Sequence, residues 1–431
     1  MDRTGAETLA TYPYWWDETP RPQLEQRPLP DEIDVVVVGS GYTGLNAALE
    51  VARAGRSVLI FDSGDAGYGC STRNGGQIST SIKPGFAELA RRHGEQAAFA
   101  ILKEGRTALD WIGDFLAREE IDCAYEVCGR FHAAHTPRHF KVLAASVKAQ
   151  PKGLEVPVHV IPRAEQREEL GTDYYHGGVV YEAHASLDPA MYHQGLLDRV
   201  LQAGGTVVPH CAVTGLARDG AGFSVTTPRG TVRAGNVIVA TNGYTGPLTQ
   251  WLRRRVIPIG SYIIATEPLS SDQMDRLMPT RRVVSDTRKV VYYYRTSPDR
   301  SRILFGGRVT NAETDPEKSG RLLKKELVRL FPELADVGFS HSWSGTVAYT
   351  FDTLAHVGCH DGVHYAMGYC GSGVSMASYL GMRVGQQVLG LTEGRTALDG
   401  LSFPTRPLYS GKPWFLAPAV AFYRWRDNQG W

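Results

Sequence analysis

The chain has 431 residues, a formal net charge of +1, 42% hydrophobic residues and 21% charged residues, which is typical of a globular protein with two or three domains. The near-zero charge argues against a nucleic-acid partner, no run of about 18 apolar residues could span a membrane, and the N-terminus lacks the apolar segment of a secretory signal. None of the six cysteines forms a CxxC pair, so we expect free thiols, no metal site and a cytoplasmic protein.

An extended arm and then a nucleotide-binding unit are predicted for the first 62 residues. Residues 1–30 carry five prolines, which disfavour regular structure. Four consecutive valines then predict a strand buried on both faces, and the turn that follows opens a helix. In that turn Gly39 permits a tight bend, Gly41 lets the backbone approach a pyrophosphate, and Gly44 lets the helix pack closely on the strand. A second strand ends at Asp62, where a ribose hydroxyl would be bound, so the pattern favours dinucleotide binding over an ordinary βαβ unit.

Hydrophobic periodicity predicts the elements that follow. One of the helices has Asp188 as a candidate N-cap and Pro189 at its first position. The predicted helices cover Ala87–Glu120, Leu187–Gly205, Gly320–Phe331 and Val374–Leu389. The predicted strands cover a pair within Cys123–Ala134, then Thr206–Pro209, Phe223–Thr227, Thr231–Ala234, Asn236–Ala240, Val290–Arg295, Arg302–Arg308 and His364–Met367.

Four further segments carry a resemblance to a known family. They are Gly67–Gln77, which contains TRNGGQ, Ala240–Thr245 with the sequence ATNGYT, Trp343–Gly345 with Thr350 and Asp352, and Tyr369–Val374. In these segments the chain resembles the D-amino-acid oxidase / sarcosine oxidase superfamily of FAD enzymes. Its Tyr-Trp-Trp arm and its C-terminal AFYRWRD segment make it most similar to the γ-glutamylputrescine oxidase group within that superfamily.

The resemblance implies an α/β fold in which a glutathione-reductase-like FAD-binding Rossmann domain carries an inserted antiparallel β-sheet substrate domain. We expect the FAD-binding domain to comprise residues 31–85, 186–250 and 353–400. The substrate domain would comprise residues 86–185 and 251–352, and residues 401–431 would form a C-terminal segment.

The resemblance also implies which residues bind FAD. Arg73 has an alternative role as an arginine bound to backbone carbonyls, Gly371–Gly373 as a plain helix start, and Val213 as a core valine. We expect non-covalent FAD, because Ser344–Tyr349 contains no cysteine and Ser63–Gln77 no histidine. Cys70 and Cys370 stay open as alternative attachment points, although the resemblance places them at the pyrophosphate and the pyrimidine end, away from the reactive methyl group. The expected FAD-binding residues are Gly39, Gly41, Tyr42, Thr43, Gly44, Asp62, Ser63, Ser71, Thr72, Arg73, Asn74, Gly75, Gly76, Gln77, Val213, Thr241, Asn242, Gly243, Gly371, Ser372, Gly373 and Val374.

Departures from the family pattern bear on the substrate. Glycine-oxidase-type members have an arginine at the position of Val347, so a bidentate clamp for an α-carboxylate is missing there. Ser372 replaces the usual histidine, and Ile303–Gly307 lacks the lysine that sarcosine oxidases use with oxygen. No catalytic side chain is identified. The candidate pocket residues, each with core packing or a solvated edge as its alternative, are Tyr292, Tyr294, Arg308, Trp343 and Tyr349.

The resemblance implies oxidation of the C–N bond of a primary or secondary amine, such as an N-acyl polyamine or an N-substituted amino acid. Hydride would pass to flavin N5, the imine would hydrolyse, and oxygen would be reduced to hydrogen peroxide. The partners would then be a small-molecule amine and oxygen or another electron acceptor. Two alternatives stay open: a dehydrogenase that passes electrons to a quinone or carrier protein, and a non-catalytic flavin-binding subunit.

Overall fold

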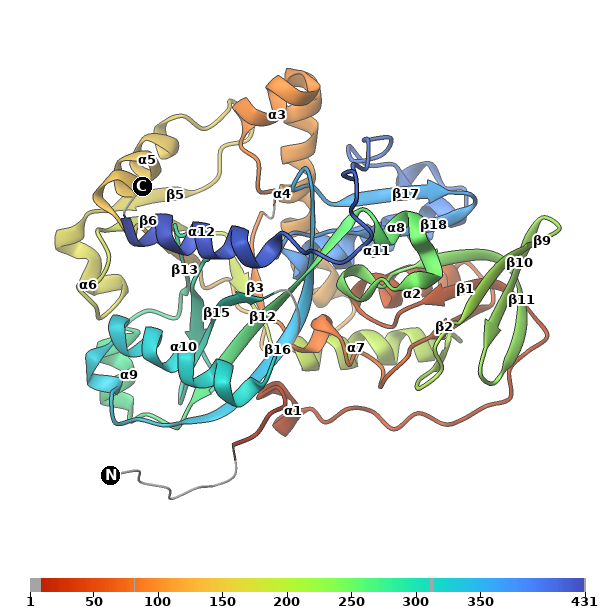
Figure 1. Ribbon diagram of the computed structural model, residues 1–431, viewed down its shortest axis with the longest axis horizontal. Coiled ribbons are helices and arrows are strands. Elements are labelled where there is room, and N and C mark those ends of the chain that lie inside the picture. Colours follow the sequence, from red (N-terminus) through yellow and green to blue (C-terminus); the bar gives the residue numbers. More distant parts are fainter. Residues whose placement is uncertain (1–8, 81, 311–313, 430–431) are drawn as a thin grey trace.

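Two eight-stranded sheets form the framework of the molecule (Figure 1). The structure is a computed structural model that describes residues 9–80, 82–310 and 314–429. The predicted α/β fold class is confirmed. The helices of four residues or more are α1 (Trp15–Glu18), α2 (Tyr42–Arg53), α3 (Phe86–His93), α4 (Glu95–Arg118), α5 (Pro137–Lys148), α6 (Gln166–Glu169), α7 (Pro189–Gln202), α8 (Gln250–Arg253), α9 (Ser271–Leu277), α10 (Pro316–Leu330), α11 (Gly373–Val388) and α12 (Leu416–Gln429).

The first sheet is built around the strand of four valines. Val35 and Val37 pack into the cluster formed with α2, and Val36 and Val38 pack into the cluster on the other face, so this strand is buried on both sides. Helix α11 lies against α2, since a Cβ at Gly381 would sit only 2.5 Å from the Thr43 carbonyl oxygen. The strand order is β17 (His356–His360), β18 (Val363–Met367), β11 (Gly230–Val239), β1 (Glu32–Val38), β2 (Val58–Phe61) and β8 (Thr206–Val208), with β9 (Gly215–Asp219) and β10 (Gly222–Thr227) attached to β11.

The second sheet is mostly antiparallel, with one parallel pair between β13 and β4. Helices α9 and α10 cover one face with a cluster that includes Met274, Leu323 and Leu327. The other face contacts α1 and the start of α7 through Ile263 and Trp343. The strand order is β16 (Phe339–Thr350), β12 (Val256–Thr266), β15 (Ile303–Thr310), β14 (Tyr293–Thr296), β13 (Val283–Asp286), β4 (Arg130–Ala133), β6 (Gly178–Tyr181) and β5 (Val158–Ile161). A separate pair joins β3 (Gln77–Ile78) to β7 (Ala185–Ser186).

Several predicted elements are confirmed at the residue level. The Asp188 carboxylate accepts the N–H groups of Ala190 and Met191 at 2.8 and 3.0 Å and so caps α7, as predicted. Strands β14 and β15 are antiparallel neighbours. The two strands predicted on either side of Gly235 are one continuous strand, β11.

Two predictions were wrong in detail. The stretch Cys123–Ala134 is not a strand pair, because its first half bonds to residues 184–188 instead of folding back on β4: Glu126 and Ser186 exchange both backbone hydrogen bonds at 2.9 Å. The long helix predicted over Ala87–Glu120 is interrupted at Gly94, whose φ of 86° ends α3 and begins α4.

The N-terminal arm contains one structured turn. Helix α1 lies within it, and Trp15 is only 1% exposed. From α1 the chain runs along the outside of the first sheet to β1 (Figure 1). Residues 1–8 of the predicted arm lie outside the described residues. The predicted domain boundaries stay a prediction.

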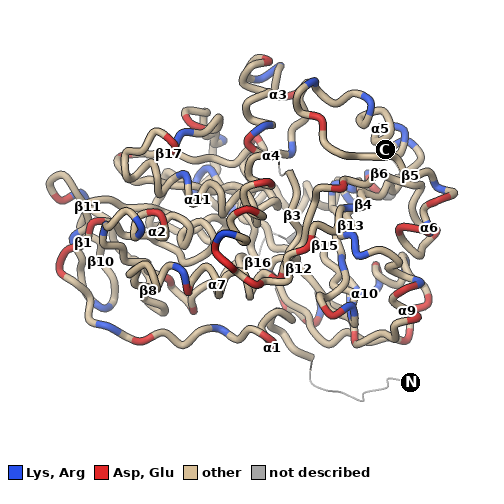
Figure 2. The backbone as a smooth tube through the Cα atoms, turned by 180° about the vertical axis from the view of Figure 1, so that it is seen from behind, with Lys and Arg blue, Asp and Glu red and all other residues tan. Residues whose placement is uncertain are grey.

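Charge and hydropathy give the same picture as the sequence. Basic and acidic residues are interspersed over the elements seen in Figure 2. Within the described part of the chain, no helix is both long and apolar enough to cross a membrane.

Candidate cofactor and substrate site

The carboxyl ends of four parallel strands meet at one edge of the first sheet. From β1 the chain moves to β2 on one side, whereas β11 and β18 lie on the other side, so the strand order reverses between β1 and β11. Ligands of open α/β sheets bind in the crevice at such a switch point. The segments that leave these strand ends include Gly39, Asp62, Thr241 and Gly368.

The glycine turn after β1 leaves no room for side chains at two positions. A Cβ at Gly39, whose φ is +105°, would lie 2.9 Å from the Ala240 carbonyl oxygen, and one at Gly44 would lie 1.9 Å from the Gly39 oxygen. Gly41 is the N-cap of α2 and offers no side-chain cap. The Tyr42 N–H donates to Ser71 Oγ at 3.0 Å, which brings the loop after β2 to this helix start.

Asp62 ties the glycine turn to the following loop. One carboxylate oxygen accepts the N–H and the hydroxyl of Ser40 at 2.8 and 2.6 Å, and the other accepts the Gly64 N–H at 3.1 Å. Ser63 beside it is exposed, and Val213 is 9% exposed in the core cluster on the far face of the sheet.

The loop Gly67–Gln77 is held by its own side chains. Asn74 Nδ2 donates to the carbonyls of Cys70 and Ser71 at 3.1 and 2.9 Å, and its Oδ1 accepts the Gly76 N–H at 2.8 Å. Thr72 Oγ1 donates to the Gly67 carbonyl at 2.7 Å. Because these groups bond within the loop, they fix its backbone.

Arg73 bonds to backbone carbonyls, as its alternative role requires, but it is buried and not a surface arginine, and its contact with the cofactor stays a prediction. It is 8% exposed, Nε donates to the Tyr68 carbonyl at 2.7 Å, and Nη1 donates to the Ser344 carbonyl at 3.2 Å. Its guanidinium lies 4.2 Å from the Tyr68 ring centroid and 4.8 Å from that of Trp16. Arg73 therefore attaches the loop to β16.

Three tryptophans hold the same loop, and two of them were not among the expected site residues. Trp15 Nε1 donates to the Asn74 carbonyl at 2.9 Å, and Trp16 Nε1 donates to Thr72 Oγ1 at 3.0 Å. The buried Trp343 donates from Nε1 to the Arg73 carbonyl at 2.9 Å. Trp343 was expected in the pocket, and the structure places it beneath the loop.

A second helix start lies beside the first one. Thr43 Oγ1 and the Tyr369 hydroxyl are 2.6 Å apart, which joins the N-terminus of α2 to the loop before α11. Ser372, the N-cap of α11, makes no side-chain cap, and Gly371 has a φ of +85°. Next to them, Asn242 Oδ1 accepts the Gly368 N–H at 2.9 Å.

Tyr293 and Tyr294 of β14, and Tyr292 just before it, divide between the two faces of the second sheet. Tyr294 is fully buried with Phe305 and Phe331 in the cluster beneath α10, and Tyr292 packs against the same cluster. Tyr292 and Tyr294, two of the three expected pocket tyrosines, therefore point away from the loop. Tyr293, on the opposite face, lies 3.2 Å from a Cβ built on Gly75 and bonds through its hydroxyl to Ser261 Oγ at 2.9 Å. Alternation along the strand predicted that neighbouring tyrosines lie on opposite faces of the sheet. Only the packing of α10 shows which of these tyrosines faces the loop.

Tyr349 and Lys83 lie at one end of the sheet face that carries Tyr293. The Tyr349 hydroxyl is 3.3 Å from a Cβ built on Gly371, and Lys83 Nζ is 5.6 Å from the Tyr349 ring centroid. Lys83 was not predicted from the sequence. Arg308 belongs to β15, but its side chain lies outside what the structure describes.

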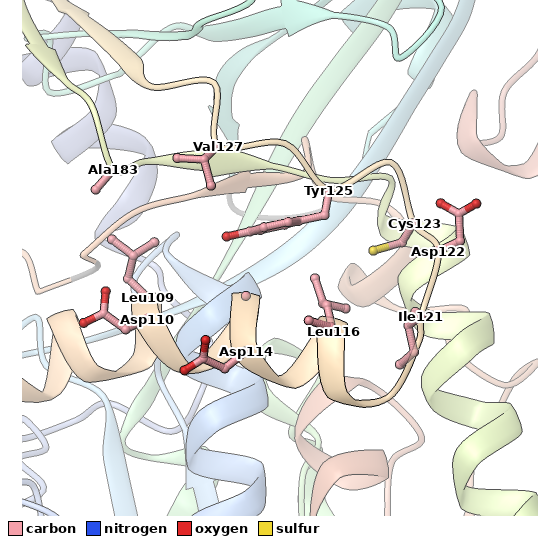
Figure 3. A pocket seen from close by; sticks show the side chains of 12 residues that line it. Leu109, Asp110, Asp114, Leu116, Ile121, Asp122, Cys123, Tyr125, Val127 and Ala183 are labelled. Atoms are coloured by element: carbon pink, nitrogen blue, oxygen red, sulfur yellow. The ribbon is translucent and has the colours of Figure 1, made fainter.

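One hollow of the molecule lies away from this sheet edge. A space of about 620 Å³ lies between α4 and residues 121–127, with Asp110, Asp114 and Tyr125 among its lining residues (Figure 3). It contains none of the expected site residues. The described residues contain no group of three His, Cys, Asp or Glu side chains placed to hold a metal ion.

The residues at the sheet edge fit FAD. Two helices, α2 and α11, begin there without side-chain caps, so their N–H groups and positive dipole ends suit a pyrophosphate and an electron-rich ring. Asp62 follows β2, the position at which folds of this kind carry the acid for a ribose hydroxyl, and its ribose role stays a prediction. Burial raises the pKa of Cys370. Non-covalent attachment stays a prediction.

Comparisons with known proteins point to the same cofactor. The family model described as DAO, FAD dependent oxidoreductase, matches residues 34–387. Gamma-glutamylputrescine oxidoreductase of Escherichia coli (strain K12) is 30% identical over 406 residues, which cover 92% of this chain and 93% of that protein. Probable oxidoreductase OrdL of Haemophilus influenzae is 28% identical over 389 residues, which cover 89% and 88%. The crystal structure of glycine oxidase from Geobacillus kaustophilus has the same fold, with a TM-score of 0.74 and 19% identity over 88% of this chain and 99% of that chain.

Proposed function

Because the chain belongs to the DAO family of FAD-dependent oxidoreductases, which act on amines or amino acids, we propose that it oxidises the C–N bond of a primary or secondary amine. An N-acyl polyamine or an N-substituted amino acid is the proposed substrate. When bound, FAD supplies the two-electron acceptor for this oxidation. The overall reaction converts amine, water and oxygen to an aldehyde or keto acid, a released amine and hydrogen peroxide.

The observation that carries the substrate class is the missing arginine clamp opposite the loop Gly67–Gln77. Val347 stands where glycine-oxidase-type members have an arginine, on the face with Ser261, Ile263 and Tyr293. Arg295 on this face is already bonded to the backbone carbonyls of Gly76 and Leu187. A free α-amino acid needs a cation for its carboxylate, and a bidentate guanidinium is the usual one. An amine without an adjacent carboxylate, such as an N-acyl polyamine, needs no such group, so this observation favours the N-acyl polyamine over the N-substituted amino acid.

The side chains of this face have distinct proposed roles. Tyr293 would flank the substrate, and burial raises its pKa, so its hydroxyl remains a neutral hydrogen-bond donor. An aromatic wall attracts a cationic amine by about 0.5–2 kcal/mol. Lys83, beside Tyr349, would attract a carboxylate at the far end of an acyl substrate.

The test is anaerobic mixing of the yellow enzyme with single amines. We expect bleaching by N-acyl putrescines that carry a distal carboxylate, and little by glycine or D-alanine. Lys83→Met should raise KM for the acidic substrates about tenfold or more and leave neutral amines unchanged, because one charge-assisted contact is lost. The matched control is Lys318→Met, an exposed lysine of α10. Rapid turnover of D-alanine with no response to any larger amine would reject the proposal.

The electron acceptor is tested in the same experiment. If oxygen is the acceptor, the bleached enzyme should regain its colour rapidly in air and release hydrogen peroxide. Slow recovery in air together with rapid recovery on adding a quinone would instead favour the dehydrogenase. Family membership favours either enzyme over a non-catalytic flavin-binding subunit.

A further inference from the structure

The C-terminal helix α12 is apolar on both of its faces. On the inner face, Leu416 and Val420 are 7% and 8% exposed and pack with Ile257 and Ile259 of β12. On the outer face, Phe422 and Trp425 are 54% and 56% exposed, and their ring centroids are 6.0 Å apart. A surface helix ordinarily turns polar residues to solvent, so exposed aromatic rings on the outer face of α12 call for an explanation.

Two further exposed aromatic residues belong to this segment of the chain: Tyr423 is 39% exposed, and Trp414 just before the helix is 69% exposed. We call Trp414, Phe422, Tyr423 and Trp425 together the aromatic patch. Figure 1 shows α12 on the outside of the molecule, running across the front toward α5. Exposed aromatic surface of this kind marks a binding site.

The charged residues of the segment that carries the aromatic patch are almost all basic. Residues 401–429 contain Arg406, Lys412, Arg424 and Arg426 and a single acid, Asp427. Asp427 faces inward, where its carboxylate accepts the N–H groups of Lys289 and Val290. The patch therefore presents basic groups to its surroundings.

Helix α5, toward which α12 runs, extends the positive charge. Its sequence includes Arg138, Lys141 and Lys148, which are exposed, and no acid. The pKa of His139 on α5 is lowered first by burial, against the charge of Asp427, and then by Arg138, Arg426 and Lys289. Basic groups of both helices, Arg138 of α5 and Arg426 of α12, thus act on the same histidine. The opposite side of the molecule carries both signs of charge (Figure 2).

We propose that the aromatic patch docks the enzyme on an anionic membrane surface. Tryptophan, tyrosine and phenylalanine enter the interface between headgroups and acyl chains, while arginine and lysine stay with the headgroups. Each basic group near an anionic leaflet adds about 1 kcal/mol of attraction. A second copy of the chain fits less well, because an isologous contact would bring like charges together.

Docking there would place the catalytic site next to the membrane. The cluster that holds the inner face of α12 also includes Val347 and Tyr349, which line the proposed substrate site. A lipid-soluble electron acceptor would then be close to the enzyme. The docking itself does not depend on which amine is oxidised.

The experiment is co-sedimentation of the FAD-loaded enzyme with vesicles, without substrate. One set contains phosphatidylcholine with one-third phosphatidylglycerol, and the other contains phosphatidylcholine alone. We expect binding to the anionic set, weakened by salt. Phe422→Ser/Trp425→Ser should lower the partition coefficient about tenfold or more, and so should Lys412→Glu/Arg424→Glu. The control Val127→Ser/Leu391→Ser removes two other exposed apolar side chains and should bind like the parent.

Other outcomes would overturn the proposal. These are absence of binding to anionic vesicles, equal binding to both vesicle sets, or a dimer in light scattering that Phe422→Ser/Trp425→Ser dissociates. The last result would assign the aromatic patch to a second copy. Circular dichroism and flavin content check that each variant is folded. Amine-dependent bleaching is measured separately, so failure of docking and failure of the proposed reaction are distinguishable.

Discussion

The glycine at position 41 has too little space for a branched side chain. A Cβ there would lie 2.8 Å from Ser71 Oγ, at the N-cap of α2 where a pyrophosphate is expected. We expect Gly41→Val to give folded protein that purifies without colour. Gly246→Val is the control, because nothing lies within 4 Å of a Cβ at Gly246 and the residue before Pro247 is already extended. Absorbance at 450 nm per chain measures the FAD content, and a fully loaded Gly41→Val enzyme would contradict the assignment.

Asp62 allows a second comparison between matched residues. The Asp62 carboxylate accepts the N–H and the hydroxyl of Ser40. Near the start of β1, the Asp34 carboxylate likewise accepts the N–H and the hydroxyl of Ser57, at 2.8 and 2.7 Å. Asp62→Ala should weaken FAD by about 1.5–3 kcal/mol, the value of a hydrogen bond to a charged group. Asp34→Ala should leave FAD affinity unchanged. Titration of the apo-proteins with FAD measures both, and equal affinities would show that another group binds the ribose.

At the scale of elements, the arm and the cofactor loop form one unit. Helix α1 donates hydrogen bonds to the loop through Trp15 and Trp16, and each such bond contributes about 1 kcal/mol net. The double variant Trp15→Phe/Trp16→Phe keeps two aromatic rings and loses both donors. We expect it to raise the Kd for FAD about tenfold and to increase hydrogen exchange of residues 70–76.

The control for this variant is Trp414→Phe, which removes an exposed indole outside the loop contacts. It should change neither FAD affinity nor exchange. Unaltered exchange in the double variant would mean that Arg73 and Trp343 hold the loop without the arm.

Periodicity predicted the elements of the nucleotide-binding unit and several others, but it missed α5, α9, α12 and β16 and did not predict how the elements combine. The pattern from residue 87 to 120 is helical throughout, yet Gly94 adopts a left-handed φ and divides it. Cys123–Ala134 has the composition of strands, but its first half finds hydrogen-bond partners around Ser186. In both places a contact distant in sequence, or one backbone angle, overrides local preference.

At the scale of the whole molecule, buried histidines should make the fold sensitive to acid. Burial lowers the pKa of His132 to about 3, of His184 to about 2 and of His193 to about 3, with nearby Arg130 lowering the first two further and Arg21 the third. Each binds a proton below about 6.5 in the unfolded chain but stays neutral when folded. The free energy of unfolding should therefore fall as pH drops from 6.5 toward 3, by about 1.4 kcal/mol per pH unit for each histidine.

Urea titrations between pH 6.5 and 5 measure this slope. His184→Phe preserves a ring to stack on Tyr181. It should reduce the slope of unfolding free energy against pH by the contribution of one bound proton. The exposed His93→Gln should leave it unchanged. A stability that is flat over this range in the parent enzyme would contradict the prediction.

The sequence by itself determined the features whose physics is local. A run of valines, a turn that only glycine fits and an acid after the next strand lie within 28 residues of one another (35–62), and together they specify the nucleotide-binding unit. The family followed from such motifs. Only the tertiary structure decided which groups meet across the chain: Trp15 and Asn74 are 59 positions apart, and Trp343 and Arg73 are 270 apart. It also decided that Tyr293 faces the loop, because α10 covers Tyr292 and Tyr294 on the other face of the sheet. Alternation along a strand places neighbouring side chains on opposite faces of the sheet, and packing decides which of them a ligand contacts.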